Sequence, residues 1–371
     1  MYALKPARNC SKPTPSSVGR RRVLQAAVAL LTAGPLAARA QQRIPIADMH
    51  SHYGMITRKI ADSGLAEDMR AQRVALVAWK LVADGRWIRA TNTGIEQSST
   101  PAPGDLAAFF NTAFERMRAY VAEQKLRLVL TPADVDACLA GESGIVLASE
   151  GADFLEGKVE NLDTAYAKGL RHLQFVHYIR TPVGDFQTVA PTHGGLSAMG
   201  KQLIEACNAK GILVDLAHST LPSVDQALEI AKAPFIWSHG WVDGDGGNWQ
   251  DPYGFLKRRL SLAHAKKIAA RGGVVGLWAL GLSRPGLGWS VGSRDTWSYA
   301  SEIAKLVDRI GADHVALGTD IEGVGPNWAV NSYGDVRKVV DQLQEMKVPT
   351  SVIERVSYAN YARVLKAVLR Q

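Results

Sequence analysis

The residues with the clearest chemical potential are histidines and acids at the ends of short apolar runs. In IADMHSH (46–52), His50 and His52 occupy alternate positions where such a run stops. Side chains at i and i+2 of a strand point the same way, so two imidazoles can reach one ion. Five further residues end later runs: Glu150, His177, His218, His239 and Asp320. Imidazoles and carboxylates in this number predict a divalent metal site.

Each of these residues has an ordinary structural explanation when taken singly. A histidine at a strand end more often packs and hydrogen-bonds than binds a metal, and Glu150 or Asp320 could cap the helix that follows. Gathered at one place, so many imidazoles would leave costly unpaired polar groups unless something bound them. We expect structural roles for the four histidines that lack such a position: His172, His193, His264 and His314.

Eight short apolar runs, each followed by a helix-like segment, must position these residues. The runs are RIPIADMHSH, RVALVAWK, GIVLASEG, LRHLQFVHY, GILVDLAHS, PFIWSHG, GGVVGLWAL and HVALGTDIEG. Apolar strands that alternate with helices indicate a parallel sheet covered on both faces. We therefore predict one α/β domain over residues 41–371, a (β/α)8 TIM barrel whose active site lies at the carboxyl ends of the strands. A doubly wound open sheet is the alternative.

Two segments rich in Gly and Trp, 240–254 and 282–297, interrupt this alternation. They fit long loops over the barrel mouth, and we expect them to shape a pocket.

The first forty residues have the pattern of an export signal. A basic start precedes an apolar stretch from Val23 to Leu36, and the small-x-small ending 38–40 follows. The pair Arg20-Arg21 resembles the twin-arginine type of signal. We predict that residues 1–40 are cleaved and that the protein is periplasmic or secreted, without stable membrane insertion. An uncleaved membrane anchor is the alternative.

The net charge of +8 resides almost entirely in this signal, because 1–40 holds seven basic residues and no acidic one. The remaining chain is near neutral, so charge gives no support for a nucleic-acid or membrane-surface partner. Of the three cysteines, Cys10 lies in the signal, and we expect Cys138 and Cys207 to be buried thiols.

Several segments resemble the membrane (renal) dipeptidase family, peptidase family M19. LASEGADFLEG is similar to the family's Ile-Glu-Gly-Gly segment, and GLSAMGKQLIEACNAKGILVDLAHST to its long Gly-Leu-Ser to Asp-x-Ser-His block. PFIWSHG, DHVALGTDIEGVG and YANYARVL match later family motifs in order. The likeness runs through nearly all of the mature chain and implies a TIM barrel of the metal-dependent hydrolase type.

The resemblance also implies a set of metal ligands. His50 matches a ligand of a first zinc, Glu150 the carboxylate that bridges two zincs, and His218 and His239 the ligands of the second zinc. The family opens with His-x-Asp, whereas this chain has His-x-His. His52 therefore replaces a carboxylate ligand and makes the site one unit more positive, while imidazole remains a competent zinc ligand.

The substrate-binding residues follow from the same resemblance. His177 matches the histidine at the scissile carbonyl, and Asp320 the acid that helps bind the substrate amine and shuttles protons. The arginine that binds the substrate carboxylate falls on Arg258, with Arg259 adjacent. Lys80, at the end of the second strand, departs from the uncharged residue usual in the family, and the sequence does not decide whether it faces the pocket.

These inferences favour a zinc-dependent dipeptidase with two divalent metal ions and a small dipeptide substrate. Two ions bridged by Glu150 would lower the pKa of a shared water and polarise the peptide carbonyl. One alternative is another amidohydrolase-type metal hydrolase, acting on a lactone, amide or phosphoester, which the His-x-His opening favours. A non-catalytic periplasmic binding protein is the other. Dimers are common in the family, which leaves a homodimer open, although the sequence shows no interface signature.

Overall fold

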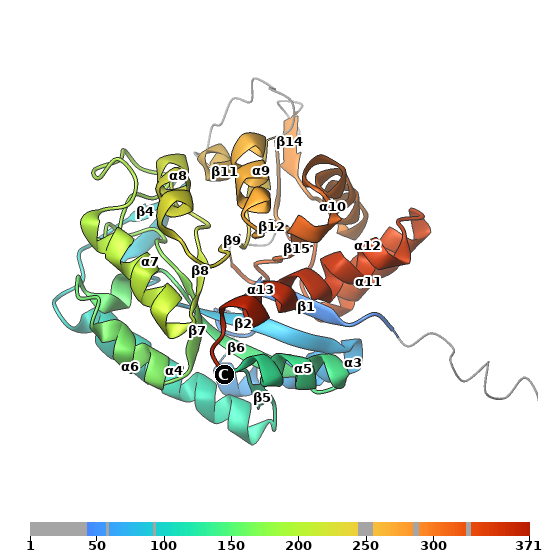
Figure 1. Cartoon of the computed structure of the whole chain (residues 1–371), viewed down its shortest axis with the longest axis horizontal. Coiled ribbons are helices and arrows are strands. Elements are labelled where there is room, and N and C mark those ends of the chain that lie inside the picture. Colours follow the sequence, from blue (N-terminus) through green and yellow to red (C-terminus); the bar gives the residue numbers. More distant parts are fainter. Residues whose placement is uncertain (1–42, 57–58, 92–93, 244–254, 285–288, 324–327) are drawn as a thin grey trace, which may run out of the picture. The chain divides into compact units, whose positions relative to one another are not determined.

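Eight short strands, built mostly from apolar residues, form a closed parallel barrel in the computed structural model of the chain (Figure 1). They are β1 (Ile46–Ser51), β2 (Val74–Val82), β6 (Gly144–Glu150), β7 (Leu170–Gln174), β8 (Leu213–Asp215), β9 (Ile236–Trp237), β12 (Val274–Leu277) and β15 (Val315–Leu317). Neighbours in this order pair in parallel, and β15 pairs with β1 to close the ring. The predicted (β/α)8 barrel is confirmed, and closure excludes the open sheet.

The structure describes residues 43–56, 59–91, 94–243, 255–284, 289–323 and 328–371. The barrel unit is Ile44–Gln371. The predicted signal at 1–40 lies outside the described residues, so its cleavage stays a prediction. Within the described residues, no helix combines the length and the apolar character that crossing a membrane would need.

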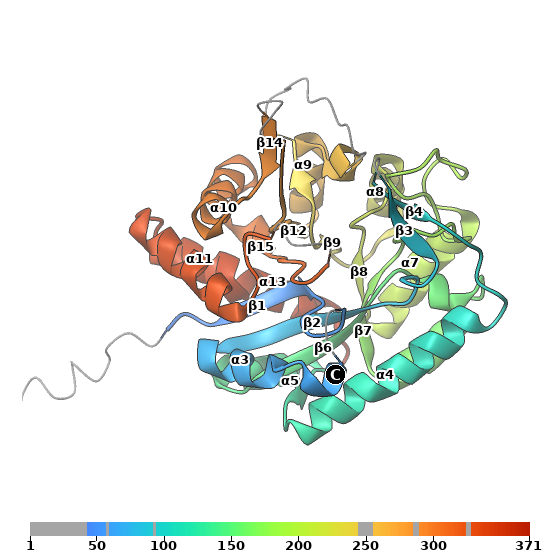
Figure 2. The same ribbon diagram turned by 180° about the vertical axis from the view of Figure 1, so that it is seen from behind.

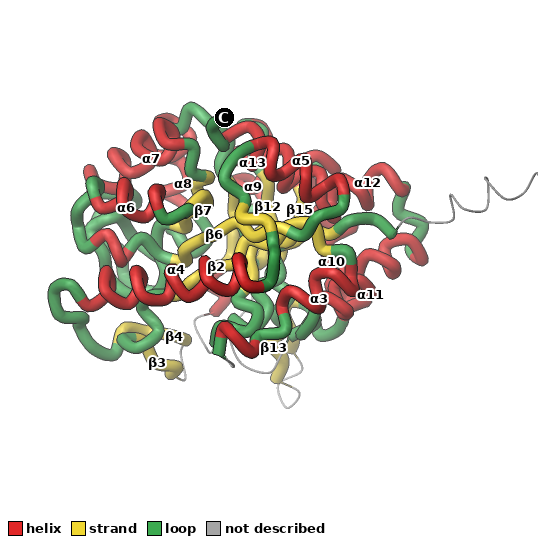
Figure 3. The backbone as a smooth tube through the Cα atoms, turned by 90° about the horizontal axis from the view of Figure 1, so that it is seen from below, coloured by secondary structure: helices red, strands yellow, loops and turns green. Residues whose placement is uncertain are grey.

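Helices surround the strands, which occupy the centre of the unit (Figure 3). They are α3 (Leu65–Gln72), α4 (Asp105–Glu123), α5 (Pro132–Ala140), α6 (Asn161–Ala167), α7 (Ala198–Lys210), α8 (Leu221–Ile230), α9 (Leu262–Ala270), α10 (Thr296–Ile310), α11 (Tyr333–Glu345), α12 (Thr350–Glu354) and α13 (Asn360–Val368). In α10 the buried residues Tyr299, Ile303, Leu306 and Ile310 recur every three or four positions, which is the spacing of an amphipathic helix. Cys138 and Cys207 are buried and free, as expected.

Three two-stranded ribbons lie outside the barrel ring. They pair β3 (Ile88–Thr91) with β4 (Gly94–Gln97), β10 (Trp241–Val242) with β11 (Arg259–Leu260), and β13 (Gly281–Arg284) with β14 (Trp289–Gly292). Figure 2 shows β3 and β4, which form one of them, and β14 of another. The two segments predicted as long loops, 240–254 and 282–297, therefore contain β10, most of β13, β14 and the start of α10. Residues 244–254 and 285–288 lie outside the described residues. Short single-turn helices, among them η3 (Phe255–Arg258), complete the connections.

Candidate metal centre

The seven residues that end the predicted strands converge at the carboxyl end of the barrel. All are buried, the most exposed being His177 at 8%. They come from β1, β6, β7, β8, β9 and β15 or from the residues directly after these strands. Five of them line a pocket of about 260 Å3: His52, Glu150, His177, His218 and Asp320.

One group of potential ligands contains His50, His52, Glu150 and Asp320. His52 Nε2 lies 2.9 Å from Glu150 Oε2 and 3.1 Å from Asp320 Oδ1. His50 Nε2 lies 3.6 Å and 3.3 Å from the same two oxygens. Asp320 was expected to bind the substrate amine, so its place among the ligand atoms is an addition to the predicted metal set.

A second group contains Glu150, His218 and His239. His218 Nε2 lies 3.0 Å from Glu150 Oε1, and His239 Nε2 lies 3.6 Å from the same oxygen. The two ring nitrogens are 3.1 Å apart. Each oxygen of Glu150 therefore belongs to a different group, as a carboxylate between two ions requires.

Hydrogen bonds at the outer ring nitrogens orient the two imidazoles of the first group. His52 Nδ1 lies 2.7 Å from the backbone carbonyl oxygen of Lys80. A carbonyl only accepts, so Nδ1 carries the proton and Nε2 of a neutral ring is an acceptor. That Nε2 lies 3.1 Å from His50 Nε2. His50 Nδ1 in turn lies 2.9 Å from Ser238 Oγ. Two imidazole nitrogens and two carboxylate oxygens that converge in this way form a donor set that fits a divalent metal.

The charge balance of the first group points the same way. Burial lowers the pKa of His52, but hydrogen bonds and charge from Asp320 and Glu150 outweigh it and raise that pKa to about 10. Burial raises the pKa of Glu150, yet the surrounding histidines hold it well below its ordinary value. Protons thus supply positive charge that a divalent ion would replace on binding.

Two of the candidate ligands also have a strained backbone. His218 and Asp320 have φ angles of 70° and 55°, in the left-handed region that residues with a Cβ rarely adopt. Such strain persists only where the surroundings over-determine it, and it clusters at functional sites. Both residues contribute a side-chain atom to the ligand groups.

His177 is oriented by an acid that the sequence analysis missed. Asp84 follows β2, and its Oδ1 lies 2.7 Å from His177 Nδ1 while Oδ2 accepts the backbone N–H of Tyr178 at 3.1 Å. Burial lowers the pKa of His177, but the charges of Asp84 and Glu150 outweigh it and raise that pKa. An acid just after a strand was the available signal, and Asp84 lies only four residues beyond Lys80.

The structure separates the two candidate arginines. Arg258 is fully buried and lines the pocket. It donates to Tyr178 Oη at 3.2 Å and approaches His239 Nε2 at 3.1 Å, and its guanidinium lies 4.9 Å from the Trp278 ring. Arg259 instead pairs with Asp243 at 2.6 Å and is absent from the pocket lining. Arg258 is therefore the arginine in reach of a ligand.

Lys80 does not line the pocket. Its ammonium group is buried inside the barrel, where it pairs with Asp215 and donates to Gln174 Oε1 at 2.9 Å. Gln174 Nε2 donates in turn to Glu150 Oε1 at 3.0 Å. Lys80 therefore acts on the site indirectly, by fixing Gln174, which in turn positions Glu150.

The four remaining histidines lie outside both ligand groups. His172 contacts Asp215 and Tyr361 in the barrel, and His264 of α9 contacts Asp225 of α8 and Ser261. His314 Nδ1 lies 3.0 Å from the carbonyl oxygen of Gly273, and the His193 backbone donates to Asp185. These contacts agree with structural roles.

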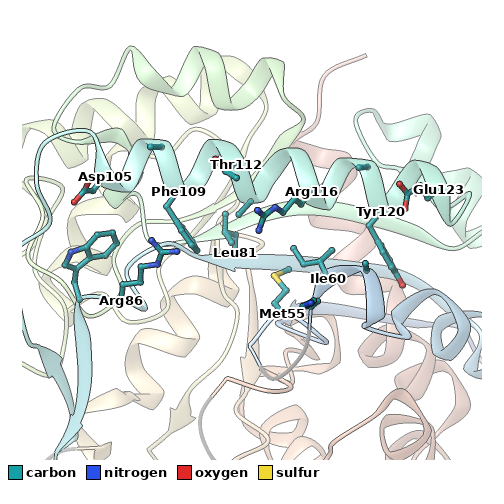
Figure 4. A pocket seen from close by; sticks show the side chains of 16 residues that line it. Met55, Ile60, Leu81, Arg86, Asp105, Phe109, Thr112, Arg116, Tyr120 and Glu123 are labelled. Atoms are coloured by element: carbon teal, nitrogen blue, oxygen red, sulfur yellow. The ribbon is translucent and has the colours of Figure 1, made fainter.

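A larger hollow of about 1010 Å3 lies beside α4 and is not the site of this chemistry. Figure 4 shows Phe109, Thr112 and Arg116 of α4 facing Leu81, Ile60 and Met55. Its lining contains no member of either ligand group. Convergent ligands, rather than volume, identify the smaller pocket as the candidate site.

Sequence comparison supports the same assignment. The family model for membrane dipeptidases (peptidase family M19) matches residues 100–370. An uncharacterised protein from the 5′ region of pqqA in Klebsiella pneumoniae is 26% identical, over 67% of this chain and 90% of its own. Dipeptidase verJ of Clonostachys rogersoniana is 25% identical over 66% of this chain, which spans 60% of that relative's length.

Solved structures share the fold. The probable dipeptidase PvdM of Pseudomonas aeruginosa superposes with a TM-score of 0.71 at 17% identity, covering 94% of this chain and 99% of its own. A metallo peptidase of Rhodobacter sphaeroides, liganded with a phosphinate mimic of L-Ala-D-Ala, gives a TM-score of 0.69 at 19% identity, covering 88% and 99%. Because the family model matches well over half of the chain, the protein belongs to the membrane dipeptidase family, a family of metallo-dipeptidase hydrolases.

Proposed function

We propose that the protein hydrolyses the peptide bond of small dipeptides at a binuclear zinc centre. The observation that carries this proposal is the division of Glu150 between the two ligand groups, with Oε2 facing His52 and Oε1 facing His218. In our assignment His50, His52 and Glu150 would hold one ion, and Glu150, His218 and His239 would hold the other. Asp320 is a further candidate ligand of the first ion.

Bound divalent ions would lower the pKa of a water and polarise the peptide carbonyl. Glu150 keeps the two ligand groups in register, so its role is mainly structural. Gln174 limits its rotation by donating to Oε1. The ligand side chains are buried, which strengthens the charge interactions among them.

His177 is the proposed oxyanion stabiliser. Its Nδ1 faces Asp84, which leaves Nε2, 3.7 Å from Glu150 Oε2, directed into the pocket. A donor at this atom can stabilise the negative charge that develops on the carbonyl oxygen. Loss of one such donor costs on the order of 10²- to 10³-fold in rate.

Two opposite charges would hold the ends of the substrate. Asp320 binds the ammonium group and passes a proton to the leaving amine, while Trp278 Nε1 steadies its Oδ2 at 2.6 Å. Arg258 pairs with the free carboxylate. An acid and a cation on one pocket of about 260 Å3 suit a molecule the size of a dipeptide.

Export belongs to the same proposal. A twin-arginine signal carries proteins that fold, and load metal, before they leave the cytoplasm. We therefore propose a periplasmic or secreted enzyme. A homodimer remains a further proposal on the strength of the family resemblance.

A second candidate function is another amidohydrolase-type metal hydrolase, which His52 favours because His-x-His is a common opening in such barrels. That group usually bridges its metals with a carboxylated lysine on the fourth strand. In this chain the fourth strand, β7, has no lysine. The buried Lys80 is engaged by Asp215 instead.

The deciding experiment measures metal content per chain on purified protein together with hydrolysis of a dipeptide panel before and after chelation. Two zinc ions per chain with chelator-sensitive dipeptide cleavage is the expected result. Two ions without dipeptide cleavage would move the substrate to the second candidate class. A chain that takes up no metal would overturn both.

A further inference from the structure

The pocket has one apolar side. Ile56, Val82, Ile88 and Ile95 line the pocket together with the charged and polar groups. None of these four residues entered the proposed reaction. Because they line the pocket, they would contact part of a bound substrate.

The β3–β4 ribbon supplies half of this apolar wall, which we define as Ile56, Val82, Ile88 and Ile95. Ala90 pairs with Ile95, and Arg89 pairs with Glu96, in the antiparallel register. Residues directly opposite one another share a face, and alternate residues share it too. Ile88 and Ile95 therefore lie on one face. Arg89 and Glu96 lie on the other, where they form an ion pair of 3.6 Å.

The ribbon is fixed at its base. The backbone N–H of Ser98 donates to the carbonyl oxygen of Trp87 at 2.7 Å, and the backbone N–H of Arg180 donates to Gln97 Oε1 at 3.1 Å. The second bond ties the ribbon to the segment after β7, close to His177. The apolar wall is thus held beside the reacting groups before a substrate arrives, which reduces the ordering that binding requires.

Ile56 is the exposed member of the apolar wall. Its side chain is 51% exposed, although Ile56 lies on the lining of the pocket. A single exposed isoleucine is ordinary on a protein surface. Here it extends a surface already formed by three other aliphatic side chains, so an apolar group in the pocket would cover all four.

The order of strands gives the orientation of a dipeptide. In the ring of eight, β2 lies opposite β9. Val82 ends β2 and Ile56 follows the neighbouring β1, whereas Arg258 follows β9, so this part of the apolar wall lies across the mouth from the cation. Asp320 follows β15, the neighbour of β1. With the carboxylate on Arg258 and the amine on Asp320, the amino-terminal residue lies nearer the apolar wall.

We propose that the apolar wall binds the side chain of the amino-terminal residue and selects dipeptides that begin with an aliphatic residue of the size of valine or leucine. This inference rests on the proposed dipeptidase function. Hydrophobic pockets discriminate by about 10- to 200-fold for each methylene-sized change. We expect kcat/KM for Leu-Ala to exceed that for Gly-Ala by 10-fold or more on this scale.

The test compares kcat/KM for Gly-Ala, Leu-Ala and Ala-Leu in the zinc-loaded wild type and in variants. Ile95→Ala and the more exposed Ile56→Ser should each lower the ratio of Leu-Ala to Gly-Ala by about 5- to 10-fold. Arg89→Ala, on the outward face of the same ribbon, should keep the wild-type ratio. Competitive inhibition by phosphinate analogues of Leu-Ala and Gly-Ala provides a binding readout that should show the same ratio.

Each other outcome overturns the inference in a recognisable way. Equal losses on Gly-Ala and Leu-Ala would make the apolar wall purely structural. A change confined to Ala-Leu would assign it to the carboxyl-terminal residue. Cleavage of all three dipeptides without preference rejects this inference alone, whereas a wild type that cleaves none of them rejects the proposed function and this inference with it.

Discussion

Two buried polar clusters are stacked in the barrel. They differ in whether their charges and hydrogen bonds are matched within the cluster. The mouth cluster contains His50, His52, Glu150, His218, His239 and Asp320. The lower network contains Lys80, Asp215, His172 and Gln174. Lys80 pairs in register with Ala148, two residues before Glu150, so the lower network lies one layer deeper than the mouth cluster.

The lower network is closed. Lys80 supplies one positive charge and Asp215 one negative charge, and the two pair directly. Asp215 Oδ1 also accepts the backbone N–H groups of Ala217 and Ser238 at 3.0 Å each. Gln174 accepts from Lys80 and donates to Glu150. Buried polar groups with all partners present specify and stiffen a core.

The mouth cluster is open. It has two carboxylates and no lysine, and its ring nitrogens face each other at 3.1 Å in two places. Histidines and acids thus form part of an internally paired network in one layer and two groups of potential metal ligands in the next. The comparison teaches that burial alone does not identify metal ligands. Buried acids and imidazoles without a lysine among them do.

Removing the shared carboxylate should have the largest effect. Glu150→Gln leaves one oxygen and no charge, so we expect kcat to fall by at least about 10³-fold and zinc content to fall with it. The measurements are turnover of a dipeptide and metal content per chain. Glu142→Gln, which alters a surface carboxylate paired with Arg127, is the matched control and should retain both. Full metal content with activity in Glu150→Gln would contradict the bridging role.

Breaking the lower network should affect stability instead. Lys80→Met leaves the Asp215 carboxylate buried without its cation, and the free energy of unfolding should fall by about 3–5 kcal/mol. Urea unfolding in chelator measures this without the contribution of bound metal. The double variant Lys80→Met/Asp215→Asn should recover part of the loss. A Lys80→Met protein of normal stability that has lost its zinc would erase the distinction between the two clusters.

The arginine beside the mouth cluster should affect binding more than folding. Arg258→Ala removes the proposed carboxylate partner, and kcat/KM for dipeptides should fall about 10²-fold. Amidated dipeptides, which lack the free carboxylate, should be affected far less. Arg259→Ala is the matched control, because that side chain pairs with Asp243. Equal losses on both substrate types would make Arg258 a structural residue.

The sequence predicted the barrel because its strands are continuous apolar runs that alternate with helices. The same regularity located the mouth cluster, since residues that end parallel strands must meet at one rim. His50, His52, Glu150, His218 and His239 were found in this way. The structure brings these predicted metal ligands together, while their roles stay predictions.

What the sequence did not predict depends on contacts between distant segments. Asp84 orients His177 from 93 residues away, and no local spacing links them. Lys80 could not be assigned a direction, because its partner Asp215 is 135 residues distant. The β3–β4 ribbon was missed because each strand has only four residues, too few for alternation to stand out.

The smallest expected effect is on the pH dependence of the unfolding free energy, which should differ between the two clusters. Burial and the charge of Lys80 lower the pKa of His172 from 6.5 to about 3. The unfolded chain therefore takes up a proton below pH 6.5 that the folded chain refuses, so this contribution is present above pH 6.5 and is lost as the pH falls toward 3. In metal-free protein the contribution of His52 has the opposite sign, since its pKa is raised to about 10 and its contribution is lost as the pH rises.

Between pH 6.5 and 5, wild type in chelator should lose about 2 kcal/mol more unfolding free energy than His172→Gln. Parallel curves for the two proteins would mean that His172 is already charged, and the lower network would then be no more self-sufficient than the mouth cluster.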